Sequence, residues 1–242
     1  MTHKPVRIGT AGWSLPQAQR ARFGPGVSIL ARYATVLNAV EINSSFYRPH
    51  RPATYARWAE TVPAAFRFAV KLPRTITHEK RLAGGAALLD SFLGEAGALG
   101  GKLGPLLVQL PPTLRCDVKI APAFFAALRG RFDGAVVCEP RHASWFTDDA
   151  DALLREARIA RAAADPARVP GAEHPGGDRG TAYFRWHGSP RMYYSEYGTE
   201  RLDALARQLR EARTKGADVW CIFDNTAEGA AAKNALEMRD LL

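Results

Sequence analysis

The sequence lacks several features by which broad protein classes are recognised. Its three cysteines, Cys116, Cys138 and Cys221, are widely spaced and form no CxxC pair, so neither a disulfide framework nor a cysteine zinc site can be inferred. No apolar run approaches the roughly 18 residues of a membrane span. No apolar signal-peptide core follows Met1. These absences predict a cytoplasmic protein without a membrane partner.

Familiar catalytic motifs are also missing. The sequence contains no GxGxxG after a predicted strand, no GxxxxGK followed by Ser or Thr, no HExxH and no GxSxG. Dinucleotide binding, P-loop chemistry, zincin proteolysis and α/β-hydrolase acyl transfer are therefore unsupported, and the cofactor stays unknown.

Acidic residues are the minority among the charged side chains. The 33 Lys and Arg residues against 24 Asp and Glu residues give a net charge of +9. No block of five or more like charges occurs, so the chain has no basic tail. Codon bias toward Arg and Ala is one explanation of the positive net charge. The other is that the protein uses a positive electrostatic field to attract anions such as phosphorylated metabolites or nucleic acid.

What the sequence does contain is an alternation of strand and helix patterns. Eight β-branched or aromatic runs recur along the 242 residues, with amphipathic helical segments between them. Helix start signals stand at Asp148, Thr199 and Thr226. The pattern predicts a single (β/α)8 TIM-type barrel domain over residues 1–242, with an open doubly wound sheet as the alternative. The Gly- and Pro-rich segment 166–180 is expected as a loop at the C-terminal face, or else as a plain surface insertion.

Polar residues gather at the predicted carboxyl ends of the strands, where barrel enzymes carry their active sites. Residues two apart on a strand share a face, so Glu41 should point with Asn43, Glu139 with Arg141, and Arg185 with His187. Charged pairs directed into a barrel mouth need partners or a ligand; a purely structural ion-pair layer is the alternative. The candidate site residues are Glu41, Asn43, Lys71, Gln109, Glu139, Arg141, His142, Asp165, Arg185, His187, Asp224 and Asn225.

The sequence does not assign a metal centre, although it offers residues that could bind one. The histidines and carboxylates of this set are suitable ligand types. However, Lys71, Arg141 and Arg185 are interleaved with them and would compete with a divalent ion for the carboxylates.

The ordered motifs of the chain resemble those of the YecE-like family, also called domain of unknown function 72. The resemblance covers nearly the whole length and rests on seven motifs. They are IGTAGWS from Ile8, VEINSSFYR from Val40, FAVKLPR from Phe68 with Thr77-His78, KLGP from Lys102 with QLPP from Gln109, EPRH from Glu139 with Ser144-Trp145, RWHG from Arg185, and FDNT from Phe223. It implies a TIM-type barrel and no established activity.

Three functional hypotheses follow. The first is an enzyme for a small anionic, sugar- or nucleotide-like substrate, in which Lys71, Arg141 and Arg185 bind the anion. Glu139 would transfer a proton, with His187 as the alternative base. The remaining polar residues would orient the substrate, and Trp13, Phe46, Tyr47, Trp145 and Tyr194 could supply a stacking wall. The second is a noncatalytic ligand-binding barrel. The third is nucleic-acid binding by a basic rim of Arg20, Arg22, Arg48, Arg51, Arg74 and Arg81. The sequence does not indicate an oligomeric state.

Overall fold

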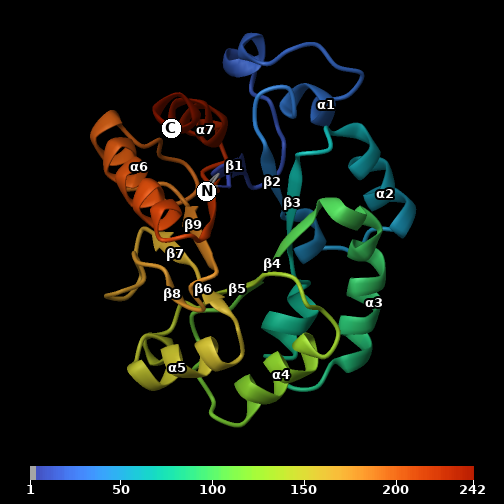
Figure 1. Cartoon of the computed structure of the whole chain (residues 1–242), viewed down its shortest axis with the longest axis vertical. Helices are drawn as coiled ribbons and strands as arrows, with labels where there is room; N and C mark the ends of the chain where they lie inside the picture. Colours follow the sequence, from blue (N-terminus) through green and yellow to red (C-terminus); the bar gives the residue numbers. More distant parts are fainter. Residues whose placement is uncertain (1–3) are drawn as a thin grey trace.

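Strands and helices alternate throughout the part of the chain that this computed structural model describes, residues 4–242. The strands are β1 (Arg7–Thr10), β2 (Ala39–Ile42), β3 (Arg67–Lys71), β4 (Leu103–Gln109), β5 (Val136–Glu139), β6 (Ala160–Arg161), β7 (Ala163–Asp165), β8 (Gly176–Gly177), β9 (Thr181–Trp186) and β10 (Asp218–Phe223). The helices are α1 (Ile29–Tyr33), α2 (Pro52–Thr61), α3 (Ala86–Ala96), α4 (Ile120–Arg129), α5 (Asp148–Glu156), α6 (Thr199–Thr214) and α7 (Ala230–Leu241). The strands lie at the centre and the helices outside them (Figure 1). The predicted alternation of strands and helices is confirmed.

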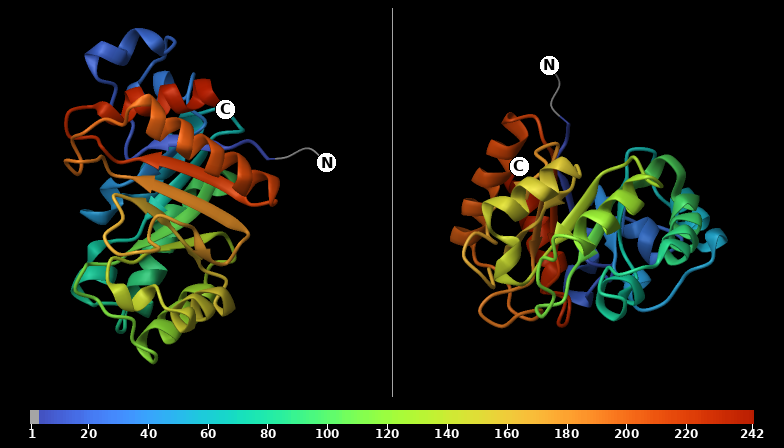
Figure 2. Two further views of the ribbon diagram at one scale, coloured as in Figure 1. Left: turned by 90° about the vertical axis from the view of Figure 1, so that its left-hand side faces the viewer. Right: turned by 90° about the horizontal axis from the view of Figure 1, so that it is seen from below.

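The strands form two sheets. One has the order β1-β10-β9-β7 and the other β2-β3-β4-β5-β6-β8. All neighbours are parallel except β6 and β8. β9 and β10 lie side by side, with α6 along them (Figure 2). The predicted α/β class with parallel strands is therefore confirmed, whereas the pairing does not show the single closed barrel that was predicted.

The strands divide into two sheets because the hydrogen-bond pairing is interrupted at two places, between β6 and β7 and between β1 and β2. The predicted sixth strand changes neighbours at Ala162: β6 pairs with β5, and β7 pairs with β9. On the other side, an isolated parallel bridge between Ala11 and Glu41 joins the two sheets.

The segment 166–180 joins β7 to β9 without a helix. Its first residues lie at the carboxyl end of β7, as predicted, but the chain then runs back along the strands. There β8 pairs antiparallel with β6 in the register Ala160↔Gly177. Gly177 has φ of 61°, and a Cβ at this position would lie 2.3 Å from the carbonyl oxygen of Ile159. The expectation that the whole segment shapes the C-terminal face is therefore wrong.

Two apolar layers flank the strands. The outer layer includes Val40, Ile42, Phe184 and Trp186, which pack toward the helices as strand alternation predicted. The inner layer consists of Ala39, Ala69, Leu107, Val137, Ala160, Ala162, Tyr183, Trp220 and Ile222.

The largest rings of the inner layer are Tyr183 and Trp220, which stack with centroids 6.0 Å apart. Gly104 makes room for them, because a Cβ there would lie 2.7 Å from the Trp220 ring. Two residues further along the strands, the same inner face carries polar residues, since alternate residues share a face. The apolar layer is thus the floor beneath the candidate site.

The helix start signals are displaced by a few residues from those predicted. α5 is capped by Thr147, whose hydroxyl accepts a hydrogen bond from the Ala150 N–H at 3.2 Å. α6 begins at Thr199 itself, after Gly198. α7 begins at Ala230, after Gly229 rather than after Thr226. Over residues 4–242 no helix combines the length and apolar character needed to cross a bilayer.

Candidate functional site

Arg185 is the centre of a buried ion-pair network at the carboxyl ends of β2, β5, β9 and β10. Its Nη2 donates to Oε1 of Glu41 at 2.8 Å, and its Nε donates to Oε2 of the same carboxylate at 2.9 Å. Its Nη1 lies 3.2 Å from Oε2 of Glu139, and its Nη2 lies 3.1 Å from Oδ2 of Asp224. The Tyr183 hydroxyl also donates to Glu41 at 2.9 Å. Because its donors face three carboxylates and its side chain is 1% exposed, Arg185 has no group left for a ligand.

Glu139 accepts hydrogen bonds on both of its oxygens. Gln109 donates to each oxygen at 3.1 Å, and Arg141 donates to Oε1 at 3.0 Å. Burial by itself would raise the pKa of Glu139, but Arg185, Arg141 and His187 outweigh it and hold the pKa well below its usual range. A saturated carboxylate of such low basicity is poorly suited to the proton-transfer role expected of it.

His187 bridges two of the carboxylates. Its Nδ1 lies 2.9 Å from Oδ2 of Asp224, and its Nε2 lies 3.1 Å from Oε1 of Glu139. Both ring nitrogens are therefore occupied, and the residue is 1% exposed. Burial raises the pKa of Asp224, but Arg185 and His187 overcome this and leave the pKa below its ordinary value. His187 thus links the two carboxylates and offers no free nitrogen to a substrate.

Lys71 differs from the other charged residues at these strand ends. Its residue is 4% exposed, yet its Nζ has no hydrogen bond or ion pair with any other residue in the range 4–242. The Nζ lies 4.0 Å from the centroid of the Phe46 ring. Burial, followed by the charge of Arg185, lowers the pKa of Lys71 to about 8, although three nearby carboxylates oppose the shift. Lys71 is therefore a largely buried amine whose Nζ contacts the Phe46 ring and forms no ion pair among residues 4–242.

A cavity of about 490 Å³ lies directly above this network. Its lining contains three cationic residues, Lys71, Arg74 and Arg141, but one carboxylate, Asp224. The volume is typical of a small-molecule site. Arg74 already pairs with Glu79 at 3.2 Å and Arg141 with Glu139 at 3.0 Å. Lys71 is the lining cation without an ion pair among residues 4–242, and it favours an anionic ligand. The other lining residues are Asn43, Phe46, Tyr47, His78, Gln109, Tyr193, Thr226 and Ala227.

Three of the predicted site residues are directed elsewhere. His142 Nδ1 accepts from the N–H of Ser144 at 3.1 Å and so caps a short helical turn. Asp165 accepts from the Tyr197 hydroxyl at 2.8 Å and pairs with Arg201. The amide nitrogen of Asn225 donates to the Ser195 carbonyl and to Asn234, each at 2.9 Å. These interactions of the three residues stabilise loops or helix termini around the cavity rather than the cavity itself.

Four residues of this region were not among the candidate site residues, although one of them, Arg74, was placed in the basic rim. Tyr183 shares a strand face with Arg185, so alternation could have identified it. Arg74 and His78 follow β3, Arg74 just before the π-helical turn Thr75–Glu79 and His78 within it. Tyr193 has φ of 70° and reaches the cavity through an irregular segment, for which the sequence gives no signal.

The predicted stacking wall is present in part. Phe46 and Tyr47 line the cavity. Trp145 is buried and donates to the Leu114 carbonyl at 2.9 Å, and Trp13 packs edge-on against Trp58. Tyr194 lies under the guanidinium of Arg191. The last three aromatic residues therefore support loop packing.

The predicted basic rim and the metal centre considered from the sequence can each be compared with the structure. Of the six basic-rim arginines, Arg74 lines the cavity, whereas Arg22 pairs with Asp240 at 2.7 Å and Arg81 bonds to Thr113. Within the described range 4–242, no group of three or more His, Cys, Asp or Glu side chains is arranged to hold a metal ion.

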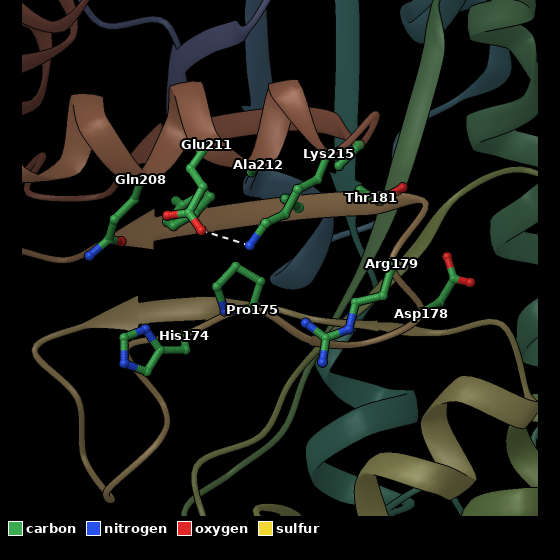
Figure 3. A pocket seen from close by; sticks show the side chains of 12 residues that line it. His174, Pro175, Asp178, Arg179, Thr181, Gln208, Glu211, Ala212 and Lys215 are labelled. Atoms are coloured by element: carbon green, nitrogen blue, oxygen red, sulfur yellow. Dashed lines mark hydrogen bonds and ion pairs between the residues drawn. The ribbon is translucent and has the colours of Figure 1, made fainter.

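A second cavity, of about 500 Å³, lies between α6 and the segment that precedes β9. Figure 3 shows Lys215 bonded to Glu211 on α6, opposite His174 and Arg179. The Lys215–Glu211 pair is 2.6 Å long and both side chains are more than half exposed. This cavity lies near the amino end of β9, because Thr181 and Ala182 line it.

The comparison with known families settles the relationship of the chain. Residues 7–242 match the family described as "Protein of unknown function DUF72". The chain belongs to the DUF72 family. The resemblance inferred from the sequence motifs is thereby confirmed.

Individual DUF72 relatives agree with this assignment. The chain is 33% identical to the UPF0759 protein YecE of Escherichia coli K12 over 144 residues, which are 58% of this chain and 50% of the relative. The match therefore spans about half the length of that relative. The UPF0759 protein YunF of Bacillus subtilis is 22% identical over 98% of this chain and 94% of its own length.

Solved structures of DUF72 proteins share the fold. A protein from Enterococcus faecalis superposes with a TM-score of 0.81 at 24% identity, over 99% of this chain and 98% of that one. A protein from Thermotoga maritima gives a TM-score of 0.81 at 23% identity, over 98% of each chain. At this level of identity the likeness establishes the fold alone.

Proposed function

We propose that this chain is an enzyme acting on a small anionic substrate bound in the cavity at the carboxyl ends of the strands. One observation carries the proposal: the unpartnered ammonium of Lys71 faces a cavity whose lining has three cationic residues and one carboxylate. A buried cation without a counter-ion is costly, and a ligand carboxylate or phosphate would supply one.

Each part of the cavity has a role in this proposal. Arg141 and Arg74 bind the anionic group, since guanidinium groups suit carboxylate and phosphate. Asn43, Gln109 and Asp224 orient hydroxyl groups of the substrate. Lys71 acts on the reacting atoms, because its lowered pKa of about 8 lets it gain and lose a proton near neutral pH.

The buried residues beneath the cavity have a supporting role. Arg185, Glu41 and His187 have their polar groups bonded to one another or to neighbouring carboxylates. We therefore assign them to positioning Arg141 and Asp224 rather than to substrate contact.

We also propose that the two sheets act together as one barrel domain over residues 1–242. The bridge between Ala11 and Glu41 and the continuity of β6 with β7 support this arrangement. It would explain why residues from β2, β3, β5, β9 and β10 share one network, as strand ends do in barrel enzymes.

The first experiment compares the melting temperature in sodium sulfate with that in sodium chloride of equal ionic strength. Sulfate at ten times its Kd should stabilise the fold by about 1.4 kcal/mol, which is a rise of roughly 3–5 °C for a chain of this size. Arg141→Gln should remove most of this rise. Arg179→Gln, in the second cavity, should retain it. If sulfate and chloride act alike on the unmodified protein, the anionic-substrate proposal is wrong.

A further inference from the structure

Lys71 has the surroundings of a nucleophilic amine rather than of a simple anion-binding lysine. It projects from the carboxyl end of β3 into the cavity, with no carboxylate within ion-pair distance among the described residues. Its Nζ lies against the Phe46 ring, and the charge of Arg185 in the network disfavours the ammonium form, whereas the carboxylates of Glu41, Glu139 and Asp224 favour it. Desolvation and nearby cations are the two effects that keep an amine neutral and able to attack a carbonyl carbon.

We propose that Lys71 forms a covalent imine with a carbonyl group of the anionic substrate. The substrate class is thus a small aldehyde or ketone that carries a carboxylate or phosphate. This inference rests on the proposed function, because Arg141 and Arg74 must hold the anionic group while the carbonyl carbon meets Nζ.

The step needs no further reactant. The lone pair of neutral Lys71 Nζ forms a bond to the carbonyl carbon, and the carbonyl π electrons move to oxygen. The nitrogen then loses one proton and the oxygen gains one, which gives a neutral carbinolamine. The oxygen takes up a second proton from solvent and leaves as water while the nitrogen lone pair forms the carbon–nitrogen double bond, so a protonated imine remains.

Other lysines of the chain provide an internal comparison. Lys102 donates to the carbonyl oxygens of Ala59 and Val62, and Lys215 pairs with Glu211 on the exposed face of α6. With a pKa of about 8 rather than the ordinary 10.5, Lys71 holds roughly two hundredfold more neutral amine at pH 7.5 than an exposed lysine.

The experiment traps the imine in the full chain. The protein is incubated at pH 7.5 with glyoxylate, pyruvate or dihydroxyacetone phosphate, and the imine is reduced with borohydride. The modified lysines are then identified by peptide mass mapping. We expect at least one probe to modify Lys71 at least tenfold more than Lys215 or Lys102, and added sulfate to suppress this labelling. Equal labelling of Lys71 and Lys215 with every probe would overturn the proposal.

A variant separates the imine from anion binding. Lys71→Arg keeps the positive charge but cannot form an imine, so it should lose the label at this position and keep the stabilisation by sulfate. If the unmodified protein is stabilised by sulfate but not labelled at Lys71, the imine is wrong and the anion site stands. If sulfate has no effect, the proposed function itself fails. The site mapping in the unmodified chain decides the question even if the variant does not fold.

Discussion

Two cavities of the molecule have almost the same volume, about 490 and about 500 Å³, but they are built differently. The first rests on Arg185, Glu41 and Glu139, which are nearly inaccessible to solvent. The second is bordered by an exposed Lys215–Glu211 pair that spans one turn of α6. Cavity volume alone therefore does not distinguish them.

The two sets of charges differ in the free energy that it costs to remove them from water. Exposed pairs one helical turn apart contribute about 0.3–0.5 kcal/mol and tolerate change. A buried set of three carboxylates around one guanidinium is expensive to desolvate and is held by precise geometry. Polar groups that are costly to bury and that lie at strand ends beside a cavity indicate function more strongly than exposed ion pairs do.

The largest expected effect is on stability and comes from breaking the buried network. Arg185→Met would leave Glu41, Glu139 and Asp224 without their shared cation, at a cost of about 3–5 kcal/mol or more. Lys215→Met in the second cavity should change the free energy of unfolding by less than about 0.5 kcal/mol. Urea unfolding of both variants checks the comparison. Similar values for the two would show that the network is not structurally distinct from a surface pair.

A smaller effect of opposite sign is expected at Lys71. The pKa of this amine falls from 10.5 to about 8 on folding. Between these pH values the unfolded chain binds more protons, so the free energy of unfolding rises with pH. The penalty of the buried ammonium is thus present below pH 8 and disappears toward pH 10.5.

Lys71→Met should therefore stabilise the fold at pH 7 by about 1–3 kcal/mol, because the full shift corresponds to about 3 kcal/mol. Its advantage should vanish near pH 10.5, whereas Lys215→Met should show no such pH dependence. Urea unfolding at pH 7, 8.5 and 10 measures this. A Lys71→Met variant less stable than the unmodified protein at pH 7 would contradict the assignment of Lys71 as a strained, functional group.

Much of the fold could be predicted because apolar periodicity is a local signal. Val40, Ile42, Phe184 and Trp186 face the helices as their alternation required. The change of partner at Ala162 could not be predicted, since it depends on which neighbouring strand offers hydrogen bonds. The return of segment 166–180 to pair with β6 is likewise a long-range event.

For the candidate site, strand alternation identified Glu41, Glu139, Arg185 and His187, which share the network. Strand alternation could not distinguish side chains whose polar groups are bonded within the protein, such as Arg185, from side chains that can still bind a ligand, such as Lys71. That distinction depends on distances between different strands. Asp165 was misjudged because it lies on the same side of β7 as Ala163, which packs outward, and it bonds to Tyr197.

The central claim is that the cavity above the Arg185 network, rather than the one beside α6, holds an anion. Crystals soaked in selenate and measured at the selenium edge test it most directly. We expect an anomalous peak about 4 Å from the Arg141 guanidinium and the Lys71 Nζ, because the selenate oxygens rather than the selenium atom lie at about 2.8 Å from the donors. A peak beside Arg179 and Lys215, with none above the network, would contradict it.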